Sequence, residues 1–267
     1  MNQSKKISYR LSVIIPAYKQ EKTIIEDLEN IQSILNQLRY DYEMIIVNDG
    51  SPDKTKEKIE DFIEKTASPK SKAKIISYEK NQGKGHAVRI GISKAEGAYI
   101  AFIDSGMDLN PNGLSMLLEH MEWYKADIIV GSKRHPASKV QYPLIRRIYS
   151  LGYQIFCSLL FGLNIKDTQT GLKIFKREVI QDVMPRLLIK KWAFDIEMLA
   201  VANHLGHTKI YEAPIELRHI FTNSNINKKV VWNMLWDTAA VFYRMHILHY
   251  YDNANKKSWA SNLSEPK

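Results

Sequence analysis

Apolar residues in the first half of the chain follow two alternating patterns. Short β-branched and apolar runs are typical of buried strands, and apolar residues three or four positions apart are typical of helices. The strand-like runs are Leu11–Ile15, Met44–Val47, Lys74–Tyr78, Ala98–Ile103 and Asp127–Val130. The helix-like segments between them are 24–38, 54–64, 85–94 and 114–123. This alternation predicts an α/β fold with a mainly parallel central sheet that is covered by helices.

The second half contains two long apolar segments. Tyr142–Leu163 carries Arg146 and Arg147 near its start and no charge after them. Val230–Tyr243 contains two tryptophans, and Asp237 is its only charge. No charge-free run in either segment is long enough to span a bilayer, since the run Ile148–Leu163 has sixteen residues. Their basic flanks and aromatic residues favour helices that lie in the membrane interface, although the same pattern fits packing on the sheet or contact with a second copy of the chain.

Composition narrows the classes of partner. The 267 residues are 45% hydrophobic and 25% charged, as in soluble globular proteins, and the formal charge of +9 favours anionic partners. Aromatic residues are not interleaved with a basic platform, which argues against nucleic acid. The one cysteine, Cys157, excludes an intrachain disulfide and a multi-cysteine metal site. Because Met1–Lys6 has no apolar signal-peptide region, we expect a cytoplasmic protein, peripheral on the inner face of the membrane.

Two carboxylates follow the fourth predicted strand. Asp104 comes directly after Ala98–Ile103, and Asp108 follows four positions later. The carboxyl ends of parallel strands form the edge where open α/β sheets bind ligands. Mg²⁺ and Mn²⁺ prefer oxygen ligands and are often held by one or two carboxylates together with substrate phosphates. The segment therefore predicts a metal and diphosphate site, and the alternative is a turn that caps the next helix.

The other strand ends also carry polar residues. Pro16–Glu21 follows the first strand, Asn48–Ser51 the second and Asn81–His86 the third. Asp49 has a carboxylate that could accept hydrogen bonds from a base or a ribose. Lys84 lies between two glycines, which allow close approach to a phosphate. Each segment alone fits an ordinary turn or helix entry, but together at one edge they favour a shared pocket.

The ordered motifs resemble the family 2 glycosyltransferases. The motifs are Val13–Tyr18, Val47–Asp53, Asn81–Val88 and Phe102–Asp108. Four later motifs are similar to the polyprenyl-phosphate hexosyltransferase branch, which includes dolichol-phosphate mannosyl- and glucosyltransferases: Gly131–Arg134, Arg146–Ser150, Asp167–Gly171 and Phe194–Glu197. The similarity covers roughly residues 10–250. It implies a nucleotide-diphospho-sugar transferase (GT-A type) fold and inversion at the anomeric carbon.

The resemblance also implies roles for matching residues. Asp104 and Asp108 match the metal ligands, and Asp49 matches the acid that contacts the nucleotide base. The predicted catalytic residues are Asp104, Asp108, Asp167 and Arg146, and the predicted substrate-binding residues are Pro16, Tyr18, Gln20, Asp49, Lys84, Arg134, Ser150, Thr170 and Arg218. Within these sets, Arg134, Arg146 and Ser150 match the acceptor-phosphate site, Asp167, Thr170 and Gly171 the loop that closes the sugar site, and Arg218 a contact to the donor diphosphate.

Four positions depart from the family pattern. The second metal acid is replaced by Gly106, so the metal would rest on Asp104, Asp108, water and the diphosphate. Gln20 stands where many members have a glutamate, and Lys19 replaces an asparagine. Lys173 replaces the arginine that usually follows the Asp-Thr-x-Thr-Gly loop. These departures affect the expected donor more than the expected reaction class.

The resemblance leads to one favoured function and two alternatives. The favoured function is inverting transfer of glucose or mannose from UDP-glucose or GDP-mannose to a polyprenyl phosphate at the cytosolic membrane face, with Mg²⁺ or Mn²⁺ as cofactor. The first alternative is a soluble or polysaccharide acceptor, with the apolar helices used in a homo-oligomer. The second is a non-catalytic nucleotide-sugar-binding protein, which Gly106 favours.

We expect three regions along the chain. Residues 1–225 form the catalytic domain, which includes the apolar helical segment 142–163. Residues 226–252 form an amphipathic helix, and residues 253–267 form a polar, disordered tail.

Overall fold

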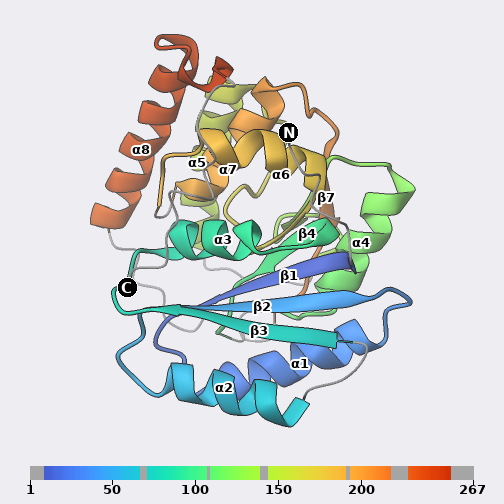
Figure 1. Cartoon of the computed structure of the whole chain (residues 1–267). Coiled ribbons are helices and arrows are strands. Elements are labelled where there is room, and N and C mark those ends of the chain that lie inside the picture. The colour runs from blue at the N-terminus through green and yellow to red at the C-terminus, as the bar shows by residue number, and fades with distance from the viewer. Residues whose placement is uncertain are drawn as a thin grey trace.

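A seven-stranded sheet forms the centre of the protein (Figure 1). The computed structural model describes residues 9–66, 71–106, 109–138, 144–190, 193–217 and 228–253. The strands, in their order across the sheet, are β3 (Ser71–Tyr78), β2 (Tyr42–Asp49), β1 (Tyr9–Ala17), β4 (Gly97–Ile103), β6 (Leu172–Lys176), β5 (Ile128–Ser132) and β7 (Ile210–Pro214). Among these described strands, β6 alone is antiparallel to its neighbours.

Helices cover both faces of the sheet. They are α1 (Ile24–Asn36), α2 (Thr55–Thr66), α3 (Lys84–Ser93), α4 (Gly113–Trp123), α5 (Leu144–Phe161), α6 (Arg177–Val183), α7 (Phe194–His204) and α8 (Lys228–His246), with short 3₁₀ turns η1 (Met184–Arg186) and η2 (Tyr250–Asp252). Helices α1, α2 and α4 share one core, and α3, α5, α6, α7 and α8 share the other. In Figure 1, α1 and α2 lie below the sheet and α3 and α5–α8 lie above it.

Side chains of the central strands alternate between the two cores. Val13 and Ile15 of β1 belong to the core with α1, whereas Ile14 belongs to the core with α3. This follows from the two-residue period of a strand, which points successive side chains to opposite faces. A strand that is buried on both faces reads as a continuous apolar run. The predicted α/β class, the mainly parallel sheet and its five strands are therefore confirmed.

Strands β6 and β7 were not predicted from the sequence. Each has only five residues, and β6 contains a lysine at its second position. Strand β6 pairs antiparallel with β4, with Leu172 opposite Ile103. This pairing brings the start of β6 to the sheet edge where β4 ends. The loop before β6, with Thr170 and Gly171, therefore lies at the predicted site.

Helices α5 and α8 pack against each other. The hydroxyl groups of Tyr153 and Thr238 are 2.9 Å apart, and the rings of Phe161 and Phe242 have centroids 6.5 Å apart. Both helices contribute to the same core as α7. The two apolar segments are thus helical, as expected. The expected boundary at 225/226 and residues 254–267 lie outside the described part of the chain, so the three-region division stays a prediction.

A buried carboxylate ties the end of α8 to α7. Glu197 is fully buried, and it accepts hydrogen bonds from the backbone N–H of Ile189 at 2.8 Å and from the Tyr251 hydroxyl at 2.7 Å. Arg244 lies 3.7 Å from the same carboxylate and donates from Nε to the Tyr251 hydroxyl. Burial raises the pKa of Glu197, although the hydrogen bonds and Arg244 act to lower it.

We expect Tyr251→Phe to destabilise the protein. The change leaves the buried Glu197 carboxylate without one donor, which costs about 1–3 kcal/mol. Urea unfolding measures the loss, and Tyr243→Phe is the control because Tyr243 is exposed on α8. Equal stability of Tyr251→Phe and the wild type would show that this hydrogen bond does not stabilise the fold.

Candidate active site

Asp104 lies at the carboxyl end of β4 against the backbone of Gly171. Its N–H donates to the Gly171 carbonyl at 2.9 Å. A Cβ atom on Gly171 would lie 1.9 Å from Oδ2 of Asp104, which leaves no room for any side chain. Position 171 therefore requires glycine, because the carboxylate and the loop before β6 approach so closely.

Asp104 is the first member of a series of ion-paired side chains with alternating charge. Lys84 Nζ lies 2.9 Å from both carboxylate oxygens of Asp104 and 3.4 Å from Oδ2 of Asp195. The other oxygen of Asp195 accepts from Lys173 Nζ at 2.6 Å. Lys173 is fully buried in β6 and also donates to the Thr170 carbonyl at 2.5 Å. The four side chains form a chain of two lysines and two aspartates.

Burial and charge act in opposite directions on these groups. Burial alone would lower the pKa of Lys84, but the Asp104 and Asp195 carboxylates outweigh it and raise the pKa. Burial would likewise raise the pKa of Asp195, but Lys173 and Lys84 hold it below its ordinary value. Burial lowers the pKa of Lys173 despite its contact with Asp195. Ion pairing thus favours the charged forms of Lys84 and Asp195.

Asp49 holds the loop that precedes Lys84. Its carboxylate accepts from the Tyr78 hydroxyl at 2.7 Å, from Asn81 Nδ2 at 2.8 Å, and from the backbone N–H of Gln82 at 2.7 Å and of Gly83 at 3.0 Å. These four donors match the acceptor capacity of a carboxylate. Asp49 therefore fixes the start of α3, and its predicted contact with a nucleotide base stays a prediction.

The loops after β1, β2 and β4 are joined by hydrogen bonds. The Pro16 carbonyl accepts from the Ser105 hydroxyl at 2.8 Å. The Gln20 N–H donates to Thr55 Oγ1 at 2.8 Å. Tyr18 lies on the same loop with 39% of its surface exposed. The predicted residues Pro16, Tyr18 and Gln20 thus lie at the same edge as Asp104.

Gly106 has a backbone conformation that favours glycine. Its φ is +113°, and its N–H donates to the buried Asp27 carboxylate at 2.8 Å. A Cβ atom there would lie 3.3 Å from Nε2 of Gln20. Two departures from the family pattern are therefore neighbours, since the Gln20 carboxamide lies beside the place where an acidic side chain at 106 would begin.

A second group of predicted residues gathers around Arg134. Its Nη1 donates to the backbone carbonyls of Lys166 at 3.2 Å and of Ser150 at 3.4 Å. Asp167 accepts from the Lys133 N–H at 3.1 Å and is buried. Arg146 precedes Ser150 by one turn of α5, and its side chain lies outside the described part of the chain. Arg134, Ser150 and Asp167 are thus neighbours.

Three buried polar atoms in this region have no hydrogen-bond partner among the described residues. They are Oγ1 of Thr170, Nε2 of Gln169 and Oε1 of Gln154. Buried polar groups are nearly always hydrogen-bonded in proteins. Thr170 is fully buried and directly precedes the glycine that contacts Asp104. The Thr170 hydroxyl therefore lies beside the contact between this loop and Asp104 without a hydrogen-bond partner among the described residues.

The described residues fit a metal site that substrate would complete. Within the described ranges, no group of three or more His, Cys, Asp or Glu side chains could hold a metal ion. Asp104 offers one buried oxygen, Oδ1, that lies 2.9 Å from Lys84 Nζ as an ion-pair contact without the geometry of a hydrogen bond. Mg²⁺ is commonly held by one or two carboxylates with substrate phosphates and water. The predicted residues Asp108 and Arg218 lie outside the described residues.

Sequence reasoning did not assign Lys173, Asp195 and Asp27 to the site. A lysine in an otherwise apolar strand was a usable signal for the first, because a buried charge needs a partner. Asp195 lies in the motif Phe194–Glu197, but no role at the site was predicted for it. Nothing in the sequence indicates that Asp27 contacts a residue 79 positions later.

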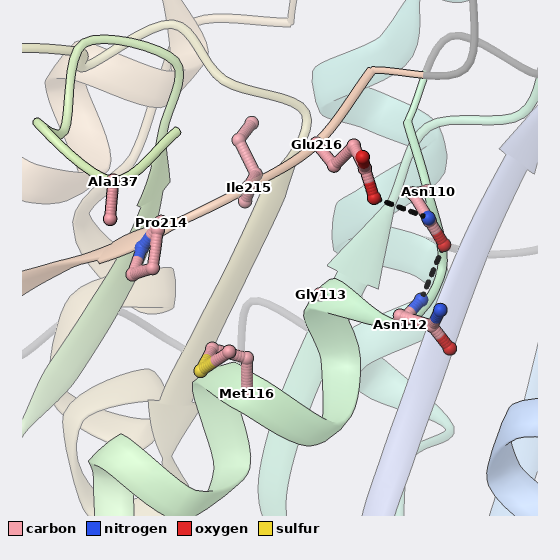
Figure 2. A pocket seen from close by; sticks show the side chains of 8 residues that line it. All are labelled: Asn110, Asn112, Gly113, Met116, Ala137, Pro214, Ile215 and Glu216. Carbon is pink, nitrogen blue, oxygen red and sulfur yellow. Dashed lines mark hydrogen bonds between the residues drawn. The ribbon is translucent and has the colours of Figure 1, made fainter. Parts of the chain in front are cut away.

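A separate hollow of about 280 Å³ opens beside the start of α4 (Figure 2). Its lining residues are Asn110, Asn112, Gly113, Met116, Ala137, Pro214, Ile215 and Glu216. Asn110 Nδ2 donates to Glu216 Oε2 at 3.1 Å across its rim. None of the predicted site residues lines this hollow, so the candidate active site is defined by the chemistry around Asp104.

Three dolichyl-phosphate beta-glucosyltransferases are similar to this chain. That of Dictyostelium discoideum is 34% identical over 207 residues, which are 73% of this chain and 63% of that protein. The Homo sapiens protein is 31% identical over 205 residues, 72% of this chain and 63% of its own length. The Saccharomyces cerevisiae protein is 29% identical over 231 residues, which are 79% of this chain and 67% of that protein. The chain thus spans less than two thirds of the first two.

Solved structures show the same fold. Glucosyl-3-phosphoglycerate synthase from Mycobacterium tuberculosis in complex with UDP superposes with a TM-score of 0.65 at 17% identity, over 88% of this chain and 79% of that chain. Its complex with Mn²⁺, UDP and glucosyl-3-phosphoglycerate gives 0.63 at 20% identity, with the same coverage. This likeness confirms the GT-A type fold.

The family assignment rests on a match over most of the sheet. The family model described as Glycosyl transferase family 2 matches residues 12–184, from β1 to the start of η1. This range contains Asp49, Lys84, Asp104 and Asp167. Since the match covers more than half of the chain, the chain belongs to glycosyl transferase family 2.

Proposed function

We propose that this protein transfers glucose from UDP-glucose to a polyprenyl phosphate, with inversion at the anomeric carbon. The observation that carries the proposal is the Asp104 carboxylate, held at the end of β4 between Gly171 and Lys84. The family membership supports a nucleotide-sugar donor. The names of the relatives favour glucose over mannose and dolichyl phosphate as the kind of acceptor.

The donor side of the reaction is assigned to the edge formed by β1, β2 and β4. Lys84 supplies positive charge where the nucleoside diphosphate leaves, and such fixed charges stabilise the developing negative charge. A divalent cation held by Asp104, with Asp108 as the second proposed ligand, would supply further stabilisation of the leaving diphosphate. Pro16, Tyr18, Gln20 and Asp49 are the proposed nucleotide-side residues.

The acceptor side is assigned to the group around Arg134. A guanidinium group binds phosphate through two parallel hydrogen bonds, so Arg134 and Arg146 are suited to a lipid phosphate. Ser150 completes this proposed acceptor site. A phosphate acceptor is already anionic and needs no strong general base. Asp167 and Thr170 are proposed to border the hexose, and the unpartnered Thr170 hydroxyl supports this.

A membrane surface is the proposed place of action. Exposed apolar residues line the outer sides of the two adjacent helices α5 and α8: Ile148, Leu151, Ile155, Leu159, Trp232 and Trp236. The two tryptophan rings are stacked on α8, with 71% of Trp236 exposed. No helix within the described ranges has the length and apolar character to cross a bilayer. We therefore propose binding to the membrane interface, on its cytoplasmic side.

A non-catalytic nucleotide-sugar-binding protein is the competing function. Gly106 favours it, because the position offers no carboxylate to a metal and its φ of +113° disfavours other residues. Donor binding without transfer under all metal conditions would support this alternative.

We expect labelled glucose to pass from UDP-glucose to a detergent-dispersed polyprenyl phosphate. Transfer should require Mg²⁺ or Mn²⁺ and should stop with a chelator, since the single ammonium group of Lys84 cannot neutralise the leaving diphosphate alone. GDP-mannose is the matched donor control. Label in a soluble glycan, or in no product at all, would contradict the proposed reaction.

We expect Asp104→Asn to lower the transfer rate about 10²- to 10³-fold, the usual effect of removing one group that stabilises a transition state. The rate of lipid labelling is measured alongside the thermal unfolding temperature. Glu60→Gln removes an exposed carboxylate on α2 and should keep full activity. Full activity of Asp104→Asn would exclude this edge as the catalytic site.

We expect the double variant Trp232→Ser/Trp236→Ser to bind anionic lipid vesicles at least about tenfold more weakly, because two exposed tryptophan side chains are lost from the interface. Vesicle sedimentation measures the effect. Trp123→Ser is the control. Trp123 is also exposed, but it lies on α4, which covers the opposite face of the sheet from α5 and α8. Unchanged vesicle binding with a loss of self-association would instead assign the surface to contact between copies.

A further inference from the structure

Lys84 is restrained on the Asp104 carboxylate by the charges behind it. Its Nζ lies 2.9 Å from both oxygens of Asp104 and 3.4 Å from one oxygen of Asp195. The second oxygen of Asp195 is taken by Lys173 at 2.6 Å. Because Lys173 is fully buried and also bound to the Thr170 carbonyl, it prevents Lys84 from moving further toward Asp195.

These four groups carry two positive and two negative charges. Asp195 neutralises Lys173, so the Asp104 carboxylate is balanced by the ammonium group of Lys84. A second carboxylate at position 106 would add a negative charge beside Asp104, but this chain has glycine there. A cation that approaches Asp104 therefore meets a carboxylate that is already paired, and both of its oxygens lie at hydrogen-bond distance from Lys84 Nζ.

We propose that Lys84 competes with the divalent cation for Asp104, and that a nucleoside diphosphate relieves this competition by accepting the ammonium group. Asp195 and Lys173 are positioning residues that hold Lys84 where it can make either contact. Cation and diphosphate then bind cooperatively, since each removes an obstacle to the other. The inference rests on one part of the proposed function, namely that a divalent cation and a nucleoside diphosphate bind at Asp104.

The test is a titration of the full chain with Mn²⁺, in which free Mn²⁺ is measured by electron paramagnetic resonance. Without nucleotide, Lys84→Met should bind Mn²⁺ about tenfold more tightly than the wild type, because the Asp104 carboxylate loses its competing partner. With saturating UDP, the two proteins should differ by less than about threefold, because UDP draws Lys84 away in the wild type.

Lys173→Met is the matched control. The substitution removes an equal charge from the same cluster. The two ammonium groups lie at similar distances from the Phe102 ring centroid, 5.3 Å for Lys173 and 5.6 Å for Lys84. Lys173 contacts Asp195 and Thr170, whereas Lys84 contacts Asp104. A long-range charge effect alone would change Mn²⁺ binding similarly in both variants. Competition predicts a clearly larger gain for Lys84→Met, because Lys173→Met lets Lys84 move toward Asp195 but leaves its ammonium group beside Asp104. Equal gains would overturn the proposal.

Two further outcomes decide the matter. Unchanged, weaker or undetectable Mn²⁺ binding by a folded Lys84→Met protein overturns the proposal, and thermal unfolding verifies the fold. If that variant does not fold, Lys84→Gln replaces it, because glutamine removes the charge but keeps a polar group. This titration measures Mn²⁺ binding and not sugar transfer, so the two proposals are tested separately. If Lys84→Met binds Mn²⁺ more tightly but the wild type transfers no hexose, the proposed function is wrong and the competition between Lys84 and the cation still holds.

Discussion

The buried carboxylate of Asp195 is the interaction on which the candidate active site depends most. It lies in the first turn of α7 and binds Lys173 of β6 through one oxygen and Lys84 of α3 through the other. Lys84 and Asp195 are 111 positions apart in the chain. An unpaired buried charge costs several kcal/mol, so each of these groups requires the others. The result is a fixed distance between α3, α7 and the end of β4.

The antiparallel direction of β6 gives this interaction its place at the ligand-binding edge. If β6 ran parallel to β4, its first residue would lie at the opposite edge of the sheet. Because β6 runs against β4, the loop of residues 167–171 arrives where β4 ends, and Gly171 contacts Asp104. The same reversal points Lys173 toward α7, beside the ring of Phe102 on the neighbouring strand. One strand reversal therefore positions both the loop of the proposed sugar site and the buried ammonium group of Lys173.

The parts of this site that could be predicted are those with a local pattern. Strands such as β1 and β2 are apolar on both faces, so their ends at Pro16 and Asp49 were visible in the sequence. Strands β6 and β7 are short and interrupted by charged residues, which resembles loop composition. The neighbours of Gly106 could not be predicted, because Asp27 and Gln20 reach it only through the folded chain. The sequence shows that an acid is missing there, whereas the structure shows what surrounds the glycine.

Helix α5 links the proposed acceptor site to the proposed membrane surface. Its sequence carries no charge after Arg147, and Tyr153 and Cys157 face the protein, whereas Ile148, Ile155 and Leu159 are exposed. The Ser150 carbonyl is bound to Arg134 near the start of the helix, at the edge where the site residues meet. From Ser150 to Leu159 the helix extends about 14 Å at 1.5 Å per residue. A lipid phosphate has its charge and its apolar chain at opposite ends, and this helix offers polar contacts at one end and an apolar side along its length. That geometry favours a lipid-linked phosphate over a soluble sugar, since a soluble acceptor would have no use for the exposed apolar side.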